Sequence, residues 1–149
     1  MRKTLLRALA AVWILALALL LWQDTVLADR AGALASLDAQ TDLQCAEALS
    51  AIHTSLFYTD SPDQAQLALA GGRLSALLPF SALSQVEGAE ALCHRYLYLA
   101  QQPAAARDIG PELQEMLREL ISALHDPQQW DTFRAQCPAA LEQLTAAIL

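Results

Sequence analysis

The chain has 149 residues, of which 55% are hydrophobic and 17% charged, and its formal net charge is −7 at pH 7. After residue 28 the sequence contains six arginines, fifteen acidic residues and no lysine. Binding to nucleic acid or to anionic lipid headgroups relies on clustered Lys and Arg, so this composition argues against both kinds of partner.

The N-terminus has the order of an export signal. Basic residues at positions 2, 3 and 7 precede the apolar run Ala8–Trp22, and Val26-Leu27-Ala28 offers a small-residue cleavage site. A helix of that length spans roughly 22 Å, which is shorter than the roughly 30 Å hydrocarbon core of a bilayer. We predict a signal peptide over residues 1–28, cleaved after Ala28; the alternative is an uncleaved membrane anchor. Both place the remainder outside the cytoplasm: periplasmic or secreted, or facing the periplasm from the inner membrane.

Ala, Leu, Gln and Glu dominate the remainder, whereas Val and Ile are scarce, and this usage favours helix over strand. We predict an all-α fold, a single up-and-down bundle of about five helices over residues 42–149, behind a weakly patterned tether over residues 29–41. The first bundle helix is expected over 42–58, because Cys45, Leu49, Ile52 and Leu56 recur at helical spacing.

The second helix is predicted to start at Ser61-Pro62 and to end near Leu78. Small residues fall along one narrow face of this segment, where a neighbouring helix could approach closely: Ala65, Ala68, Gly72 and Ala76. A break at Gly71-Gly72 is the competing interpretation.

Three more helices complete the predicted bundle. Ser84 and Glu87 have the spacing of a capping box and predict a third helix from about 84 to 101. The fourth is expected from Pro111 to about Leu124, and it carries the clearest apolar stripe in the chain. The fifth follows Asp126-Pro127 and reaches about residue 148, with Pro138 either kinking it or dividing it in two.

The three cysteines carry the most specific chemistry in the sequence. Thiols outside the cytoplasm are oxidised, and three cysteines allow three single bridges. We predict a disulfide between Cys45 and Cys137, because closing the longest loop restricts the unfolded chain most. The alternative is a bridge between Cys93 and Cys137, which lie at similar distances from the start of their helices. This alternative stays open.

Metal and catalytic motifs are not recognisable. The sequence has no CxxC, HxxxH or CxxCH, so we predict no metal and no cofactor. Ser50, His53 and Ser55 are close in sequence, but no nucleophile elbow or orienting acid accompanies them. We therefore expect a protein that is not an enzyme.

One segment is more apolar than a single buried stripe requires. Residues 96–99 read Tyr-Leu-Tyr-Leu, which indicates either a central helix contacted on most sides or a surface that binds a partner. The predicted partner surface comprises Phe80, Tyr98, Leu99 and Trp130. The expected function is an exported helical protein that acts by protein–protein contact, as an inhibitor, immunity factor or chaperone, with an unidentified protein partner. The alternative is a bitopic accessory subunit of an inner-membrane complex.

Overall fold

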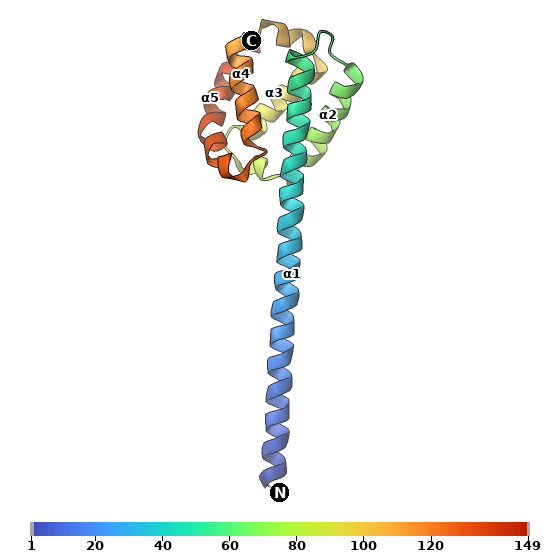
Figure 1. Cartoon of the computed structure of the whole chain (residues 1–149), viewed down its shortest axis with the longest axis vertical. Helices are drawn as coiled ribbons and strands as arrows, with labels where there is room; N and C mark the ends of the chain where they lie inside the picture. Colours follow the sequence, from blue (N-terminus) through green and yellow to red (C-terminus); the bar gives the residue numbers. More distant parts are fainter. Residues whose placement is uncertain (1, 149) are drawn as a thin grey trace. The chain divides into compact units, whose positions relative to one another are not determined.

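The computed structural model describes the backbone of residues 2–148 and the side chains of residue 13 and residues 15–148. This part of the chain contains helices and no strand, so the predicted all-α class is confirmed (Figure 1). The α-helices are α1 (Arg2–Phe57), α2 (Gln64–Leu77), α3 (Ala89–Gln101), α4 (Pro111–Ala123) and α5 (Trp130–Ile148). Short 3₁₀ helices connect them: η1 (Leu78–Phe80), η2 (Ala82–Gln85), η3 (Pro103–Asp108) and η4 (Pro127–Gln129).

The chain divides into two compact units, Met1–Leu37 and Asp38–Leu149. Residues 2–37 of the first unit belong to α1. The segment 29–41, which was expected to be a tether, is helical throughout. The large apolar side chains described in this unit are exposed: Trp13, Leu15, Leu17, Leu19, Leu20, Leu21, Trp22, Leu27, Leu34 and Leu37. Within the described residues, no helix combines the length and the apolar character that a bilayer crossing needs. The side chains of Arg2, Lys3 and Arg7 lie outside the described residues, and cleavage after Ala28 stays a prediction.

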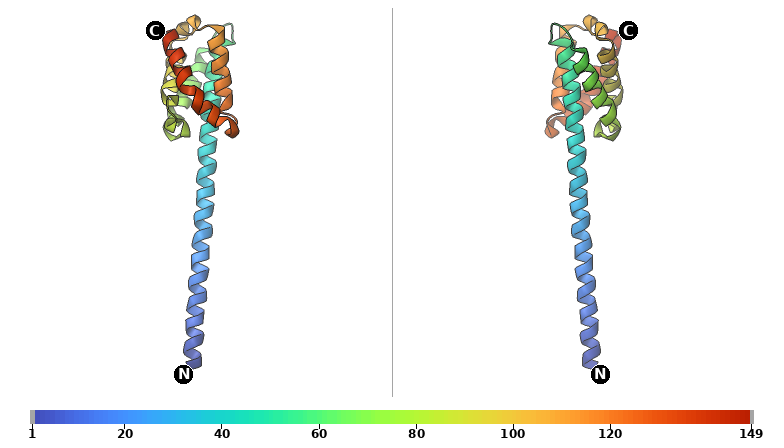
Figure 2. Two further views of the ribbon diagram at one scale, coloured as in Figure 1. Left: turned by 90° about the vertical axis from the view of Figure 1, so that its left-hand side faces the viewer. Right: turned by 90° about the vertical axis from the view of Figure 1, so that its right-hand side faces the viewer.

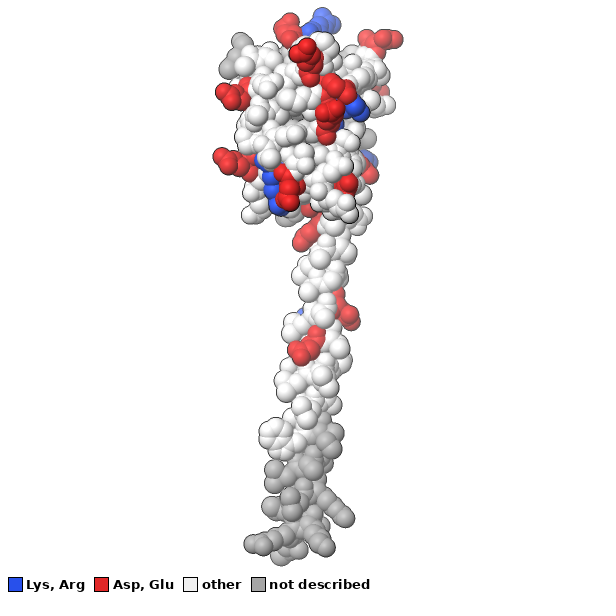
Figure 3. Space-filling view, turned by 60° about the vertical axis from the view of Figure 1, so that its left-hand side comes forward, with Lys and Arg blue, Asp and Glu red and all other residues white. Residues whose placement is uncertain are grey.

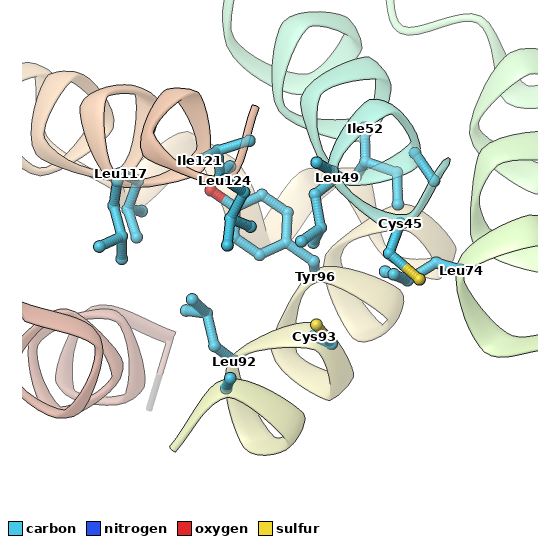
Figure 4. Packing of buried hydrophobic residues seen from close by; sticks show 14 of the residues in the cluster. Cys45, Leu49, Ile52, Leu74, Leu92, Cys93, Tyr96, Leu117, Ile121 and Leu124 are labelled. Atoms are coloured by element: carbon cyan, nitrogen blue, oxygen red, sulfur yellow. The ribbon is translucent and has the colours of Figure 1, made fainter. Parts of the chain in front are cut away.

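The second unit encloses one hydrophobic core. Residues 44–57 of α1 lie beside α2 and α4, while α3 packs against α2 and α5 (Figures 1 and 2). The stripe predicted for the first bundle helix is confirmed, because Cys45, Leu49 and Ile52 are each at most 1% exposed. Figure 4 shows how these side chains meet residues of α2, α3 and α4, with Tyr96 near the centre of the cluster.

The start of α2 differs from the expectation. The N-cap is Asp63, whose carboxylate accepts hydrogen bonds from the N–H groups of Ala65 at 2.9 Å and Gln66 at 3.3 Å. The glycine pair does not break the helix; a Cβ on Gly71 would lie 3.6 Å from Leu97 Cδ2 of α3.

The predicted small-residue contact face on α2 is wrong. The four residues expected on it are exposed: Ala65, Ala68, Gly72 and Ala76. Leu67 and Leu74 are buried instead, because burying leucine removes far more apolar surface from water than burying alanine, and Ala70 lies on the same buried face.

The third helix begins at Ala89, five residues after the predicted N-cap Ser84. Gly88 precedes it with φ of +78°, a left-handed conformation that glycine adopts without steric cost. The preceding turn is held from α1: Asp42 Oδ1 accepts hydrogen bonds from the hydroxyl of Ser81 at 2.6 Å and from the N–H of Ala82 at 2.8 Å. The chain therefore forms η2 where the capping-box spacing predicts α-helix.

The last two helices match their predicted positions closely. Pro111 is the first residue of α4, and α5 is one helix that contains Pro138. Asp126 caps η4 by accepting a hydrogen bond from the N–H of Gln128 at 2.9 Å. The α4–α5 connection is thereby fixed, and it places Trp130 at the start of α5.

Candidate functional site

A groove of about 540 Å³ lies within the second unit, beside the α4–α5 connection. We call it the Trp130 groove. Two of its apolar lining residues differ in burial: Leu43 is 42% exposed and Leu124 is 3% exposed. The groove therefore has an apolar base and an open side. Its lining residues are Ala39, Asp42 and Leu43 of α1 together with Leu124, His125, Pro127, Trp130, Asp131 and Arg134.

Two contacts hold the indole of Trp130. Its Nε1–H donates a hydrogen bond to the carbonyl oxygen of Leu124 at 3.4 Å. The guanidinium of Arg134, one turn later, lies 5.9 Å from the ring centroid, within the range of a cation–π contact. These contacts hold the half-buried ring in one orientation.

The charges of the groove are unevenly engaged. Arg134 Nη1 lies 3.3 Å from Asp131 Oδ1, but the Asp131 side chain is 94% exposed. Asp42 uses Oδ1 to bond Ser81 and Ala82. Acidic side chains are also spread over the face of the second unit seen in Figure 3, with few basic ones beside them. The groove can therefore offer carboxylate oxygens to a cationic partner.

A second cluster of aromatic and polar groups surrounds His53 of α1. His53 is 2% exposed, and its Nδ1 lies 2.9 Å from the hydroxyl oxygen of Tyr96 of α3. Its ring centroid lies 4.8 Å from that of Phe57 and 5.8 Å from that of Tyr58. A pocket of about 240 Å³ adjoins it, lined by Ser50, His53, Thr54, Tyr58, Arg118 and Ile121.

Burial sets the protonation state of His53. Desolvation lowers its pKa from 6.5 to about 4; Arg118 lowers it further, whereas Glu115 acts in the opposite direction. The imidazole is therefore neutral at pH 7. When the Tyr96 hydroxyl donates to Nδ1, the remaining proton is on Nε2, which has no hydrogen-bond partner among the described residues. The opposite tautomer would leave two groups unsatisfied, so we assign the proton to Nε2.

The pocket beside His53 is bordered by an ion pair. The Arg118 Nε–H donates to Glu115 Oε2 at 2.8 Å, and the Tyr58 hydroxyl donates to the same oxygen at 3.2 Å. The hydrogen bond from Arg118 lowers the pKa of Glu115, which is ionised at pH 7. The Arg118 and Tyr58 donors thus both bond the Glu115 carboxylate. Together with His53 and Tyr96, these side chains connect α1, α3 and α4.

The structure separates the four residues predicted to form a partner surface. Leu99 is 0% exposed, so the prediction that it contributes to a surface is wrong. Phe80 in η1 is 75% exposed and Tyr98 is 37% exposed, with its hydroxyl donating to Gln102 Oε1 at 3.1 Å. Only Trp130 lies in the groove, and the roles of Phe80 and Tyr98 stay predictions.

The disulfide predicted between Cys45 and Cys137 is not present; all three cysteines are free and buried. Desolvation raises the pKa of Cys93 to about 12, with smaller contributions from Cys45 and Cys137. Cys45 and Cys93 lie on neighbouring helices, α1 and α3 (Figure 4). Loop length and position along the helices, on which the sequence prediction was based, do not show which helices lie side by side.

Two long-range hydrogen bonds have no clear signal in the sequence. His53 and Tyr96 are 43 positions apart, and Asp42 and Ser81 are 39 apart. Neither pairing belongs to a local motif. Within the described residues, no group of three or more His, Cys, Asp or Glu side chains is placed to hold a metal ion.

Family models, curated proteins and solved structures provide no match to this chain.

Proposed function

We propose that this protein acts outside the cytoplasm by binding another protein, and that the Trp130 groove is the contact site. The observation that carries the proposal is an open groove with an apolar base and a fixed indole. Tryptophan is among the residues that contribute most to protein–protein binding when a partner covers it. An inhibitor, immunity or chaperone role fits this contact.

The chemistry of the groove supports binding over catalysis. Its lining residues include no Ser, Thr, Cys, Tyr or Lys, which leaves the acidic groups and His125 as the reactive side chains. Asp131 is paired with Arg134, and Asp42 is bonded to the turn before α3. Catalysis by such groups requires a base or nucleophile directed at a substrate, whereas one oxygen of each carboxylate is engaged by a neighbouring group. The up-and-down order of the helices, inferred from their short connections, belongs to the same proposal.

Site-specific cross-linking in the native cell envelope tests the contact. A photoreactive phenylalanine analogue replaces Leu43 in the groove, and in a matched control it replaces Leu69 on α2, which is 60% exposed. We expect one protein adduct from position 43 and none from position 69. Adducts from position 69 alone would contradict the assignment of the groove, and adducts from neither position would contradict action by protein contact.

A second candidate function is a bitopic subunit of an inner-membrane complex. The exposed apolar side chains of the first unit favour it, since soluble proteins seldom expose many large apolar side chains without a partner. Mass spectrometry of the native protein separates the two candidates. An N-terminus at Asp29 supports the exported protein, whereas an intact N-terminus with extraction only in detergent supports the subunit.

A further inference from the structure

We infer that the occupant of the Trp130 groove is a cationic amphipathic helix of a partner protein, with a large apolar side chain in the groove and basic residues beside it. This inference rests on the proposed function and adds the chemistry of the partner to it.

The two sides of the groove are each one helical turn. Ala39 and Leu43 are four residues apart on α1, and Trp130 and Arg134 are four apart on α5. Residues at this spacing lie one above the other on one helix face. Two such faces leave a channel between them, and the row of side chains on a third helix fits a channel of this kind.

The size of the groove fits side chains better than a whole helix. A volume of about 540 Å³ is small beside a helix of several turns, so it admits large side chains of the partner and not its backbone. Leu43 and Trp130 remain accessible on opposite sides, so an inserted leucine or phenylalanine contacts both. The rest of the partner helix then lies over the rim, where Asp131 is located.

The charge of the chain selects a basic partner. The protein carries a formal charge of −7, and the Asp131 carboxylate keeps 94% of its side-chain surface exposed despite its ion pair with Arg134. Asp42 adds a second carboxylate, of which Oδ2 accepts no hydrogen bond from the described residues. A second copy of this chain would bring the same negative charge, so like-charge repulsion disfavours it.

Binding of two synthetic peptides to the full-length protein tests the inference. Both are amphipathic helices with the same leucine positions, and their polar faces consist of lysine in one and glutamate in the other. Each carries a fluorophore, and anisotropy reports binding at 0.15 M salt. We expect the lysine peptide to bind and the glutamate peptide to bind at least about tenfold more weakly, since the apolar contact is common to both.

Variants locate the bound peptide. Trp130→Ala should weaken binding of the lysine peptide about tenfold or more. Leu43→Arg is a second variant in case Trp130→Ala folds poorly, because Leu43 is exposed and lies outside the core; it should weaken binding to the same extent. Asp131→Asn should weaken it about threefold. Asp108→Asn, at an exposed acid outside the groove, is the matched control and should leave binding unchanged.

The outcomes separate the two proposals. Equal weakening by Asp131→Asn and Asp108→Asn means general charge attraction and overturns the inference. Equal binding of both peptides overturns it as well. If cross-linking from position 43 still captures one protein, protein contact through the groove stands while its cationic chemistry does not. If the lysine peptide binds as expected but nothing is captured, the proposed function is contradicted instead.

Discussion

The His53 cluster and the Trp130 groove combine similar side chains in opposite ways. Both place an aromatic ring near an arginine–carboxylate pair. His53 is 2% exposed and Tyr96 is 0% exposed, whereas Asp131 keeps 94% of its side chain in water. Residue types alone therefore do not distinguish a site that stabilises the fold from a site proposed to bind a partner. Burial does, and substitutions should therefore cost folding free energy in one region and binding in the other.

The largest expected effect comes from Tyr96→Ala. Tyr96 is fully buried, and removing a large aromatic side chain from a core costs about 3–5 kcal/mol, because contacts are lost and a cavity remains. Tyr98→Ala, two positions later on the same helix and 37% exposed, should cost less than about 1 kcal/mol. Urea unfolding followed by circular dichroism measures both. Equal losses would remove the distinction between the enclosed and the open positions.

The second largest effect is the pH dependence of the free energy of unfolding that arises from His53. The unfolded chain takes up this proton near pH 6.5, but the folded protein takes it up only near pH 4. The stabilisation is therefore fully present above pH 6.5 and is lost as the pH falls to 4, by about 3 kcal/mol in total.

A histidine control isolates this contribution from that of the carboxylates. His53→Gln should remove that part of the pH dependence of unfolding free energy between pH 7 and 4. His94→Gln, whose side chain is 63% exposed, should leave the dependence as it is in the unmodified protein. Parallel pH profiles for His53→Gln and the unmodified protein would show that burial does not hold His53 neutral.

Tyr96→Phe should lower the free energy of unfolding by less than Tyr96→Ala does or protonation of His53 does. It keeps the ring and removes the hydroxyl that pairs with His53 Nδ1, so a buried acceptor is left unsatisfied at a cost of about 1–2 kcal/mol. The double variant with His53→Phe, which removes both polar groups, should recover part of this loss. A double-mutant cycle on unfolding free energies tests the coupling, and additive losses would mean that the two side chains do not interact.

Asp131→Asn should have the smallest effect on folding. The ion pair with Arg134 is exposed, and such pairs contribute between about 0 and 1 kcal/mol. Thermal unfolding should therefore change little, while binding of the lysine peptide weakens. A large drop in the melting temperature would place Asp131 among the stabilising groups and undo the contrast between the two regions.

The helices were predictable wherever apolar spacing and local caps determine them. Cys45, Leu49 and Ile52 recur at helical spacing and are buried, and Pro111 opens α4 as expected. The row Tyr96 to Leu99 was ambiguous, because successive helical residues point about 100° apart. Packing resolves it: Tyr96 and Leu99 enter the core while Tyr98 remains exposed.

Long-range pairs were beyond the reach of the sequence. The spacing of Ser84 and Glu87 predicted a helix start, but Asp42 binds the preceding turn and Gly88 starts α3 later. The Trp130 groove likewise combines residues about 90 positions apart. A local pattern contains no information about which distant side chain supplies a hydrogen bond, so these features required the three-dimensional structure.

Asp42 belongs to two parts of the second unit at once. One of its oxygens bonds the turn at Ser81 and Ala82, and the same carboxylate borders the groove that contains Trp130. A lysine that draws this carboxylate toward itself competes with the turn for the same negative charge. Groove occupancy and the opening of that turn are then thermodynamically linked, and the exchange rate of the Ala82 amide proton becomes a remote indicator of whether the groove is filled.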